Sequence, residues 1–492
     1  MHTHPKTTTL LISMALAIGA GCPVDQQFGE VCAIDQSVCD DECVQTDADP
    51  DNCGACGVVC GDGEVCDGAG SCASVCDIEA VYCGDTCIDP LTDNDYCGAS
   101  NDCMGLDDGV TCPDGFNCTD GLCKEPPVVV VAMALGSNHS CSQMSDGSAY
   151  CWGGQQHGQL GNGALDLWGI TYPDKVLTDN MAPPRPIDNI AQIASGGGSH
   201  SCVLLEDKTM KCWGTNAKGQ LGLGVIGDST PFPTSVPDLA DVATMDVGRF
   251  NTCAALEDGT VKCWGRNDRG QLGNTVDEDI STPLTVAGLT DIQDVQIGIN
   301  YVCALDGAGD VFCWGRNEWG QTGDGTTVDR HVPNKVEGLS QVEQIATGGW
   351  HSCALLTDGT VQCWGFNMHG QLGYGGADTV PHFEPVAIAG LVDVKSLHLG
   401  WKYSCALLDD GTAKCWGNNE FGQLGWIAPD TDNHPVPTEV PGLTNLTGMA
   451  TDYKHACAWN GEGEMWCWGR NQEGQLGDGT RDDRYWPLPV VW

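Results

Sequence analysis

The sequence predicts an all-β protein: a seven-bladed β-propeller of four-stranded antiparallel blades, preceded by a small disulfide-rich region. One sequence motif recurs seven times between Cys141 and Cys467: a cysteine followed by nine residues and then Cys-Trp-Gly. Successive units start 50 to 61 residues apart. A period of this length is typical of a propeller or a solenoid. Short β-rich runs bounded by Gly, Pro, Asn or Asp fill each unit, and no long run has a helical period, which favours the propeller.

The third unit shows the four strands that we expect in each blade, at 241–247, 251–256, 260–264 and 283–286. Glu257-Asp258-Gly259 is a three-residue hairpin loop with glycine at the left-handed position. This loop sets the register so that Cys253 lies opposite Cys263. Six of the seven units carry glycine at this place, and the exception is Lys208.

Directly paired cysteines can form a disulfide, so each blade is expected to contain one bridge between its second and third strands. The expected pairs are Cys141–Cys151, Cys202–Cys212, Cys253–Cys263, Cys303–Cys313, Cys353–Cys363, Cys405–Cys415 and Cys457–Cys467. Each bridge closes a short loop and should contribute about 2.5–3 kcal/mol to stability.

The tryptophan that follows each second cysteine points to the opposite face of its strand. Since the second strand is apolar on both faces, both faces of a blade should be buried against neighbouring blades. The chain ends in residues 485–490, which resemble a fourth strand, and the repeats begin with 128–135, which resemble a first strand. We expect these two segments to join in one blade and close the ring.

The repeated string H-S-C-A-L-x-x-D-G-x-x-x-C-W-G-x-N-x-x-G-Q-L-G resembles the regulator of chromosome condensation repeat, over about residues 128–492. Gly-Gln-Leu-Gly recurs in six units, and Gly320-Gln321-Thr322-Gly323 is a near match. The resemblance implies a seven-bladed propeller. It leaves function open, because the family includes a chromatin-bound nucleotide exchange factor for a small GTPase and a secreted bacterial inhibitor of β-lactamases.

Residues 1–21 are expected to be an export signal, because their apolar run, 10–18, is too short to span a membrane. Cys22 follows Gly19-Ala20-Gly21, as in a bacterial lipoprotein cleavage site, so we expect a lipid on Cys22 and a tether at 22–31. If Cys22 carries a lipid and 14 cysteines pair within the propeller, 16 of the 31 cysteines remain. This number is even, so all of them can pair in disulfides. Secretion without an anchor is the alternative.

The remaining cysteines fall into two modules, at 32–75 and 76–123, joined to the propeller by a linker at 124–127. The first three cysteine intervals of both modules are 7, 4 and 10 residues, which indicates a duplication with four disulfides in each copy. The segment from Asn52 to Gly57 resembles the plant stigma-specific protein family. A zinc site at Cys53 and Cys56 is disfavoured, because the second module breaks the Cys-x-x-Cys spacing.

The chain is strongly acidic, with a net charge of −46. Residues 22–126 hold 24 acids and one base, and the propeller holds 43 acids and 19 bases. Nucleic acid is therefore not an expected partner, and nucleotide exchange is implied by the resemblance alone. Asp47, Asp49 and Asp51 alternate, which leaves calcium binding open, although the glycine and glutamate of a helix-loop-helix site are missing.

Two polar positions recur without indicating catalysis. The residue two before each first cysteine is histidine in four units but Asn251, Tyr301 or Tyr403 in the others, which favours a turn-stabilising role over a metal ring. Glutamine precedes the last Leu-Gly or Thr-Gly of every unit, as expected for a residue that bonds loop backbone. We expect no catalytic residue, metal or cofactor.

The loops between first and second strands and between third and fourth strands emerge on the same side of the ring. This side carries variable aromatic residues and two insertions, at 162–186 and 426–435, and exposed aromatics on a rigid scaffold favour recognition. Packing between blades is the alternative for each of the candidates, which are Trp168, Phe250, Trp319, Trp350, Trp401, Phe421 and Trp426.

We therefore expect an exported, lipid-anchored, non-catalytic monomer at the cell envelope that binds a protein or glycan through this face. An enzyme-inhibitor role is a sharper version of the same function. An extracellular hydrolase or lyase is the alternative of another class, and it would need clustered carboxylates or histidines on the strands that face the central axis.

Overall fold

The computed structural model describes residues 127–166, 168–178 and 185–492, together with eight short strands between residues 37 and 124. The chain divides into two compact units, Met1–Pro127 and Val128–Trp492. The expected export signal, the tether with Cys22 and the acidic segment with Asp47 lie outside the described residues. So does the disulfide pairing of the cysteine-rich modules.

The first unit contains four two-stranded hairpins, two in each expected module. Their strands are β1 (Ser37–Cys39) with β2 (Glu42–Val44), β3 (Glu64–Cys66) with β4 (Cys72–Ser74), β5 (Val81–Cys83) with β6 (Thr86–Ile88), and β7 (Asn117–Thr119) with β8 (Leu122–Lys124).

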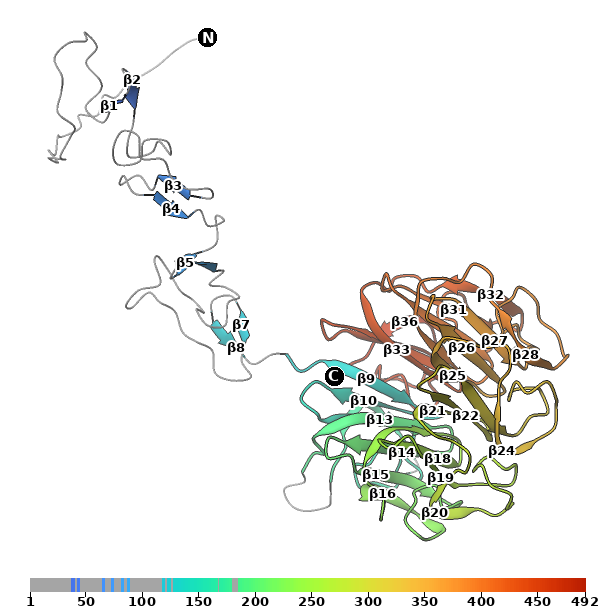
Figure 1. Cartoon of the computed structure of the whole chain (residues 1–492). Helices are drawn as coiled ribbons and strands as arrows, with labels where there is room; N and C mark the ends of the chain where they lie inside the picture. The colour runs from blue at the N-terminus through green and yellow to red at the C-terminus, as the bar shows by residue number, and fades with distance from the viewer. Residues whose placement is uncertain are drawn as a thin grey trace, which may run out of the picture. The chain divides into compact units, whose positions relative to one another are not determined.

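The second unit is a ring of seven four-stranded antiparallel sheets, each built from consecutive strands (Figure 1). Blades 1 to 3 consist of β9 (Val130–Leu135), β10 (His139–Met144), β11 (Ala149–Gly153) and β12 (Ile170–Lys175); β13 (Ile190–Gly196), β14 (His200–Leu205), β15 (Met210–Asn216) and β16 (Gly227–Ser235); β17 (Val242–Val247), β18 (Asn251–Leu256), β19 (Val261–Gly265) and β20 (Ile280–Thr285).

Blades 4 to 7 consist of β21 (Ile292–Gly298), β22 (Tyr301–Asp306), β23 (Val311–Gly315) and β24 (Arg330–Lys335); β25 (Val342–Thr347), β26 (His351–Leu356), β27 (Val361–Gly365) and β28 (His382–Ala387); β29 (Val394–Leu399), β30 (Tyr403–Leu408), β31 (Ala413–Asn418) and β32 (Asn433–Glu439); β33 (Leu446–Asp452), β34 (His455–Asn460), β35 (Met465–Gly469) and β36 (Arg484–Pro489). The predicted seven-bladed, all-β architecture is confirmed.

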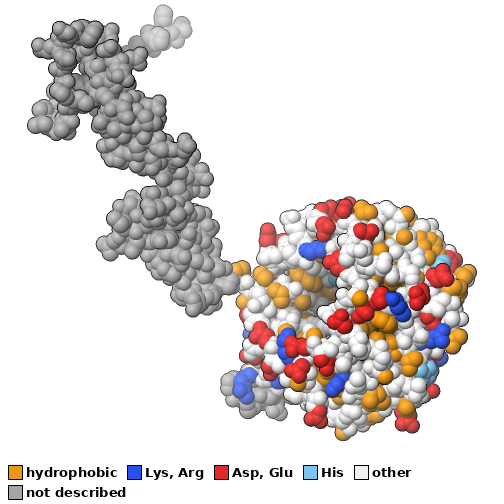
Figure 2. Space-filling model, in the orientation of Figure 1, with side chains coloured by type: hydrophobic (Ala, Val, Ile, Leu, Met, Phe, Trp, Pro, Cys, Tyr) orange, Lys and Arg blue, Asp and Glu red, His pale blue; other side chains and the backbone are white. Residues whose placement is uncertain are grey.

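The first strands of neighbouring blades contact one another and surround the axis, whereas the fourth strands lie outermost and are partly exposed. Between them, second and third strands bury both faces, and the seven tryptophans of the repeats are fully buried. Acidic side chains are spread over the displayed face of the ring, with hydrophobic ones between them (Figure 2). None of the described segments forms a helix of the length and hydropathy that a membrane crossing requires.

The predicted register is confirmed, because Cys253 pairs with Cys263 and the equivalent cysteines pair in every blade. All seven disulfides form, with the Cα atoms of each pair 4.1 Å apart. Gly259 has a φ of 78°, and a Cβ there would lie 2.5 Å from the backbone N of Asp291 in the next blade. The turn therefore needs glycine for both its conformation and its packing.

The predicted closure of the ring is wrong. β36 pairs with β35 in blade 7, and β9 pairs with β10 in blade 1, so the end segments do not share a sheet. Each blade consists of four strands that are consecutive in the sequence. A blade contacts the next one through its buried face and not through the edge of its sheet. The ring closes because blade 7 packs face to face on blade 1, with the indole N–H of Trp152 2.9 Å from the carbonyl oxygen of Gln475.

Candidate binding site

One glutamine in each blade connects that blade's loop to the next blade. Its side-chain Oε1 accepts a hydrogen bond from the backbone N–H two residues earlier in all seven units. Its backbone carbonyl accepts the indole N–H of the next blade's tryptophan at 2.8–3.0 Å. The predicted structural role of the glutamine is confirmed. These bonds fix the loop between third and fourth strands to the disulfide-linked core.

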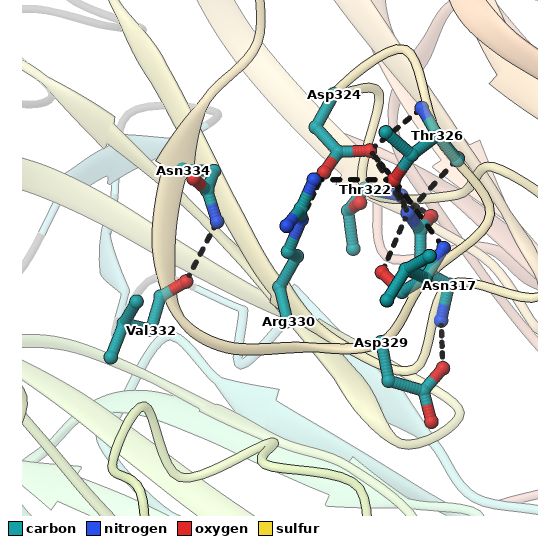
Figure 3. A network of polar contacts seen from close by, with 9 residues as sticks. Asn317, Thr322, Asp324, Thr326, Asp329, Arg330, Val332 and Asn334 are labelled. Carbon is teal, nitrogen blue, oxygen red and sulfur yellow. Dashed lines mark hydrogen bonds and ion pairs between the residues drawn. The ribbon is translucent and has the colours of Figure 1, made fainter.

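The same loop is held from the inside by an asparagine, as blade 4 shows (Figure 3). The side-chain N–H₂ of Asn317 donates to Asp324 Oδ1 at 3.0 Å and to the carbonyl of Val328 at 3.2 Å, and its Oδ1 accepts the N–H of Thr322 at 3.0 Å. Arg330 then pairs with Asp324. Blade 7 builds the same network from Asn471, Asp478 and Arg484. The outer loops are therefore ordered supports for the residues around them.

The four histidines of the repeats bridge adjacent blades, rather than stabilising turns as predicted. Each Nε2 lies 2.8–3.1 Å from a serine or threonine hydroxyl, in the pairs His139–Ser201, His200–Thr252, His351–Ser404 and His455–Ser140. Burial lowers their pKa to about 3, so the imidazoles stay neutral. Within the described part of the chain, no group of three or more His, Cys, Asp or Glu could hold a metal ion.

Five aromatic side chains, which we call the aromatic ladder, lie on one face of the ring from blade 4 to blade 7. Two come from loops between third and fourth strands and three from loops between first and second strands, which we call the inner loops. Their ring centroids lie 4.7 Å apart for Trp319 and Phe366, 5.4 Å for Phe366 and Trp350, and 5.7 Å for Trp350 and Trp401. Tyr453 stacks on Trp401 at 4.4 Å. Phe366 is buried and the other four are half-buried, so the ladder is anchored by packing and remains partly exposed.

Three cations without an ion pair lie beside aromatic rings on this face, two of them beside the ladder and the third beside Phe250. Lys402 Nζ is 4.4 Å and Lys454 Nζ 5.4 Å from the centroid of Trp401, and Arg249 lies 5.2 Å from the ring of Phe250. None of the three has a carboxylate within 4.0 Å among the described residues. We call the ladder and these three cations the mouth.

The mouth surrounds a cavity of about 50 Å³ where the inner loops meet at the axis, lined among others by Arg249, Trp401, Asp452 and Tyr453. Asp452 is partly exposed there, but its Oδ2 is buried and has no hydrogen-bond partner. Burial raises its pKa to about 7, and the nearby Asp246 carboxylate adds to the rise.

The other six blades have glycine at the position of Asp452, namely Gly136, Gly196, Gly248, Gly298, Gly348 and Gly400. At Gly196, a Cβ would lie 1.9 Å from the carbonyl oxygen of Gly248, so this row of the ring has almost no room for side chains. Among the seven equivalent positions, Asp452 is therefore the only one that places a carboxyl group in the cavity wall.

Other polar side chains on the first strands bond the inner edge of the ring itself. The bonded pairs are Gln192 with Met245, Gln344 with Leu397, and Asp246 with Ile297, at 2.6–3.1 Å. Each pair satisfies backbone groups of the next blade that no strand covers. Burial raises the pKa of Asp246 to about 6 and that of Asp294 to about 7. Asp246 is thereby held by the backbone of the next blade, and Asp294 bonds Gln296 and the N–H of Val295.

The structure brings some of the candidate aromatics together and separates others. Trp319, Trp350 and Trp401 belong to the ladder, and Phe421 lies 4.0 Å from Lys454 Nζ. Phe250 packs under Arg249. Trp168 is 79 % exposed and has no ring contact with the ladder. Trp426 packs against the core of blade 6 and against His434.

Sequence reasoning missed the charged part of the site. The mouth's cations stand next to aromatic residues in the inner loops, as Arg249-Phe250, Trp401-Lys402 and Tyr453-Lys454. These neighbouring cation–aromatic pairs are visible in the sequence, but the strongly negative net charge of the chain gave no reason to expect a positively charged site. Asp452 could have been found by aligning the seven units, because it replaces a glycine that stands in all the others.

Comparison with known proteins agrees with this architecture. Residues 282–491 match the RCC1-like domain, and the regulator of chromosome condensation (RCC1) repeat matches at 130–159, 190–220 and 242–271 and also at 146–204 and 258–305. The Ultraviolet-B receptor UVR8 of Arabidopsis thaliana is 32% identical over 364 residues, covering 73% of this chain and 69% of the receptor. Protein pim1 of Schizosaccharomyces pombe is 30% identical but only 31% of it is covered.

Solved structures show the same fold. Yeast RCC1 (Prp20) bound to Kap60 superposes with a TM-score of 0.61 at 22% identity, covering 74% of this chain and 85% of that one. Human WBSCR16 gives a TM-score of 0.58 at 24% identity, covering 70% and 94%. With the repeats, the seven blades and a full-ring relative at 32% identity in agreement, this chain belongs to the regulator of chromosome condensation repeat family.

Proposed function

We propose that this protein is an exported, lipid-anchored, non-catalytic binding protein that recognises a partner protein through the mouth. The observation that carries the proposal is the gathering of the aromatic ladder and three unpaired cations on one side of a rigid ring. Half-buried aromatics held by a scaffold lose little freedom on binding, which makes them effective anchors. An enzyme-inhibitor role remains a special case, in which the partner is an enzyme.

Relatives support a protein partner over a glycan. One solved relative is bound to Kap60, and another, Prp20p from Saccharomyces cerevisiae, is described with its binding to Gsp1p and histones. These partners are partners of the relatives only. For this chain we carry over only the general use of the propeller as a surface that binds proteins. The engagement of Asp246 and Asp294 within the ring favours binding over hydrolase or lyase chemistry.

Replacing Trp350 and Trp401 by alanine is expected to weaken partner binding by about 30-fold or more, since a central aromatic anchor is worth at least ~2 kcal/mol. The measurement is a pull-down of partners from the native host with the full exported chain, followed by titration of the captured protein. Trp168→Ala is the matched control, because Trp168 is exposed but lies outside the ladder. Equal affinity of the double variant and the parent chain would refute the proposed face.

The export and anchoring part of the proposal has its own test. Cys22→Ser is expected to move the mature protein from the membrane fraction to the soluble fraction of the native host, because a serine cannot carry the thioether-linked lipid. Metabolic labelling with a fatty acid should mark the parent chain and leave the variant unlabelled. A parent chain that is soluble and unlabelled would show that the protein is secreted without an anchor.

A further inference from the structure

The charge of the mouth is opposite to that of the ring around it. The propeller carries 43 acids and 19 bases, yet the inner loops present Arg249, Lys402 and Lys454 without carboxylate partners. Bases further out on the same face are neutralised locally, for example Lys218 by Asp279 at 2.9 Å and Arg269 by Asp329 at 3.2 Å. Among the described residues, unpaired positive charge therefore gathers around the centre of this face, where Arg470 also bonds Asn138 and Gln472 rather than a carboxylate.

Two of these cations lie beside the same aromatic cluster. Lys402 Nζ is 4.4 Å from the ring centroid of Trp401, and Lys454 Nζ is 4.0 Å from the centroid of Phe421 and 5.4 Å from that of Trp401. Burial lowers the pKa of Lys454, and the positive charges of Arg470 and Lys402 lower it further, whereas the carboxylates of Glu420 and Asp483 raise it. Both ammonium groups are positively charged and lie beside the same indole, so an anion bound there would be attracted to both.

The third cation faces the same opening from the other side of the axis. Arg249 comes from blade 3 and Tyr453 from blade 7, and both line the central cavity. An extended ligand that crosses the axis would therefore meet Arg249 near one part of its length and the two lysines near another. The Trp401–Tyr453 stack would lie beneath it.

We propose that the mouth binds an acidic, extended segment of a protein, with its carboxylates on Arg249, Lys402 and Lys454 and its apolar side chains on the aromatic ladder. This proposal rests on the proposed function and specifies the partner's chemistry. A segment fits better than a broad acidic surface, because the outer loops carry Asp277, Glu278, Asp482 and Asp483 and would repel it.

The same argument disfavours a nucleic acid or a sulfated glycan. A long polyanion would cross the acidic outer loops on both sides of the mouth, and the few cations there could replace only a few of its counterions. A peptide can place its carboxylates at the cations and its apolar side chains on the ladder. A polyanion is charged along its whole length, and the apolar ladder would remove water from those charges without replacing its hydrogen bonds.

The test compares two variants of the full exported chain with equal changes in charge. The mouth variant is Arg249→Glu, Lys402→Glu and Lys454→Glu. The control variant is Lys208→Glu, Lys262→Glu and Lys395→Glu, which lie toward the opposite end of the ring, near the tight turns and the connections between blades. The probe is a short fluorescent peptide of glutamate and leucine, followed by fluorescence anisotropy at low and high salt.

The parent and the control variant are expected to bind the peptide with a strong salt dependence, and the mouth variant at least about tenfold more weakly. Thermal unfolding checks that all three chains are folded, and Arg249→Gln, Lys402→Gln and Lys454→Gln should give an intermediate loss if the fold of the glutamate variant is impaired. Equal binding by the mouth and control variants would overturn the proposal, as would tighter binding of heparin or a single-stranded oligonucleotide than of the peptide.

The outcome also separates the two proposals. If the native partner is lost on Trp350→Ala and Trp401→Ala but kept by the mouth variant, the face is right and the acidic class is wrong. If the tryptophan variants keep the partner, the proposed function itself fails.

Discussion

Replacing Trp152 by alanine is expected to lower the free energy of unfolding by about 3–5 kcal/mol, the range for a fully buried aromatic side chain. Trp152 is buried between blades 7 and 1, and its indole N–H is 2.9 Å from the carbonyl oxygen of Gln475. The substitution removes the packing of the indole and leaves this carbonyl with only the hydroxyl of Ser140 as a donor. The measurement is the shift of the urea midpoint, with the disulfides intact.

Trp314→Ala is the matched control, because Trp314 makes the same contact with Gln271 at 3.0 Å in the middle of the chain. The two variants should lose similar stability, since the junction between chain ends has the same contacts as the internal junction. A Trp152→Ala midpoint equal to that of the parent chain, next to a lowered Trp314→Ala midpoint, would show that blades 7 and 1 do not close the ring in this way.

Asp452→Asn is expected to stabilise the protein above pH 7, by on the order of 4 kcal/mol, and to have little effect below pH 4. The folded-state pKa of Asp452 is about 7, above its ordinary value of 3.8, because the carboxyl is buried. The folded protein therefore holds this proton more tightly than the unfolded chain. The parent loses stability as pH rises from about 4 through 7, whereas asparagine has no proton to lose.

The measurement is the unfolding midpoint of both chains from pH 4 to 8. Asp294 and the four bridging histidines titrate in both chains and largely cancel in the difference, whereas Asp246, whose charge raises the pKa of Asp452, contributes to it. Asp258→Asn is the control, since hydrogen bonds from Thr260 lower the pKa of this exposed turn carboxyl. It should not stabilise the protein at pH 8. A pH-independent difference for Asp452→Asn would contradict a carboxyl that is protonated in the folded state.

Features that each blade repeats could be predicted from the sequence because local spacing determines them. The hairpin loop at Gly259 sets the pairing of Cys253 with Cys263, and alternation along the strand then buries Trp264 on the other face. Seven copies of the same rule specify seven blades. The role of the glutamines followed for the same reason, since a side chain that recurs in every unit is used in every unit.

The parts that were missed depend on the arrangement around the axis. Arg249 and Tyr453 are 204 positions apart in the sequence and line one cavity only because three blade junctions bring them there. Closure was mispredicted because an unpaired first strand and an unpaired fourth strand look complementary, whereas buried blade faces made a shared sheet unnecessary. Trp426 illustrates a third limit: an aromatic in an inserted loop can turn back onto its own blade.

Closure by faces alone has a consequence for how this chain is organised. Every blade is one uninterrupted stretch of sequence, and blade 7 meets blade 1 through the same indole-to-carbonyl contact that joins every other pair. The seven junctions between blades are therefore equivalent, and the fold does not require the break in the ring's chain to lie between blades 7 and 1. A circular permutant opened at any connection between blades would keep all seven contacts and place the same three cations around the axis.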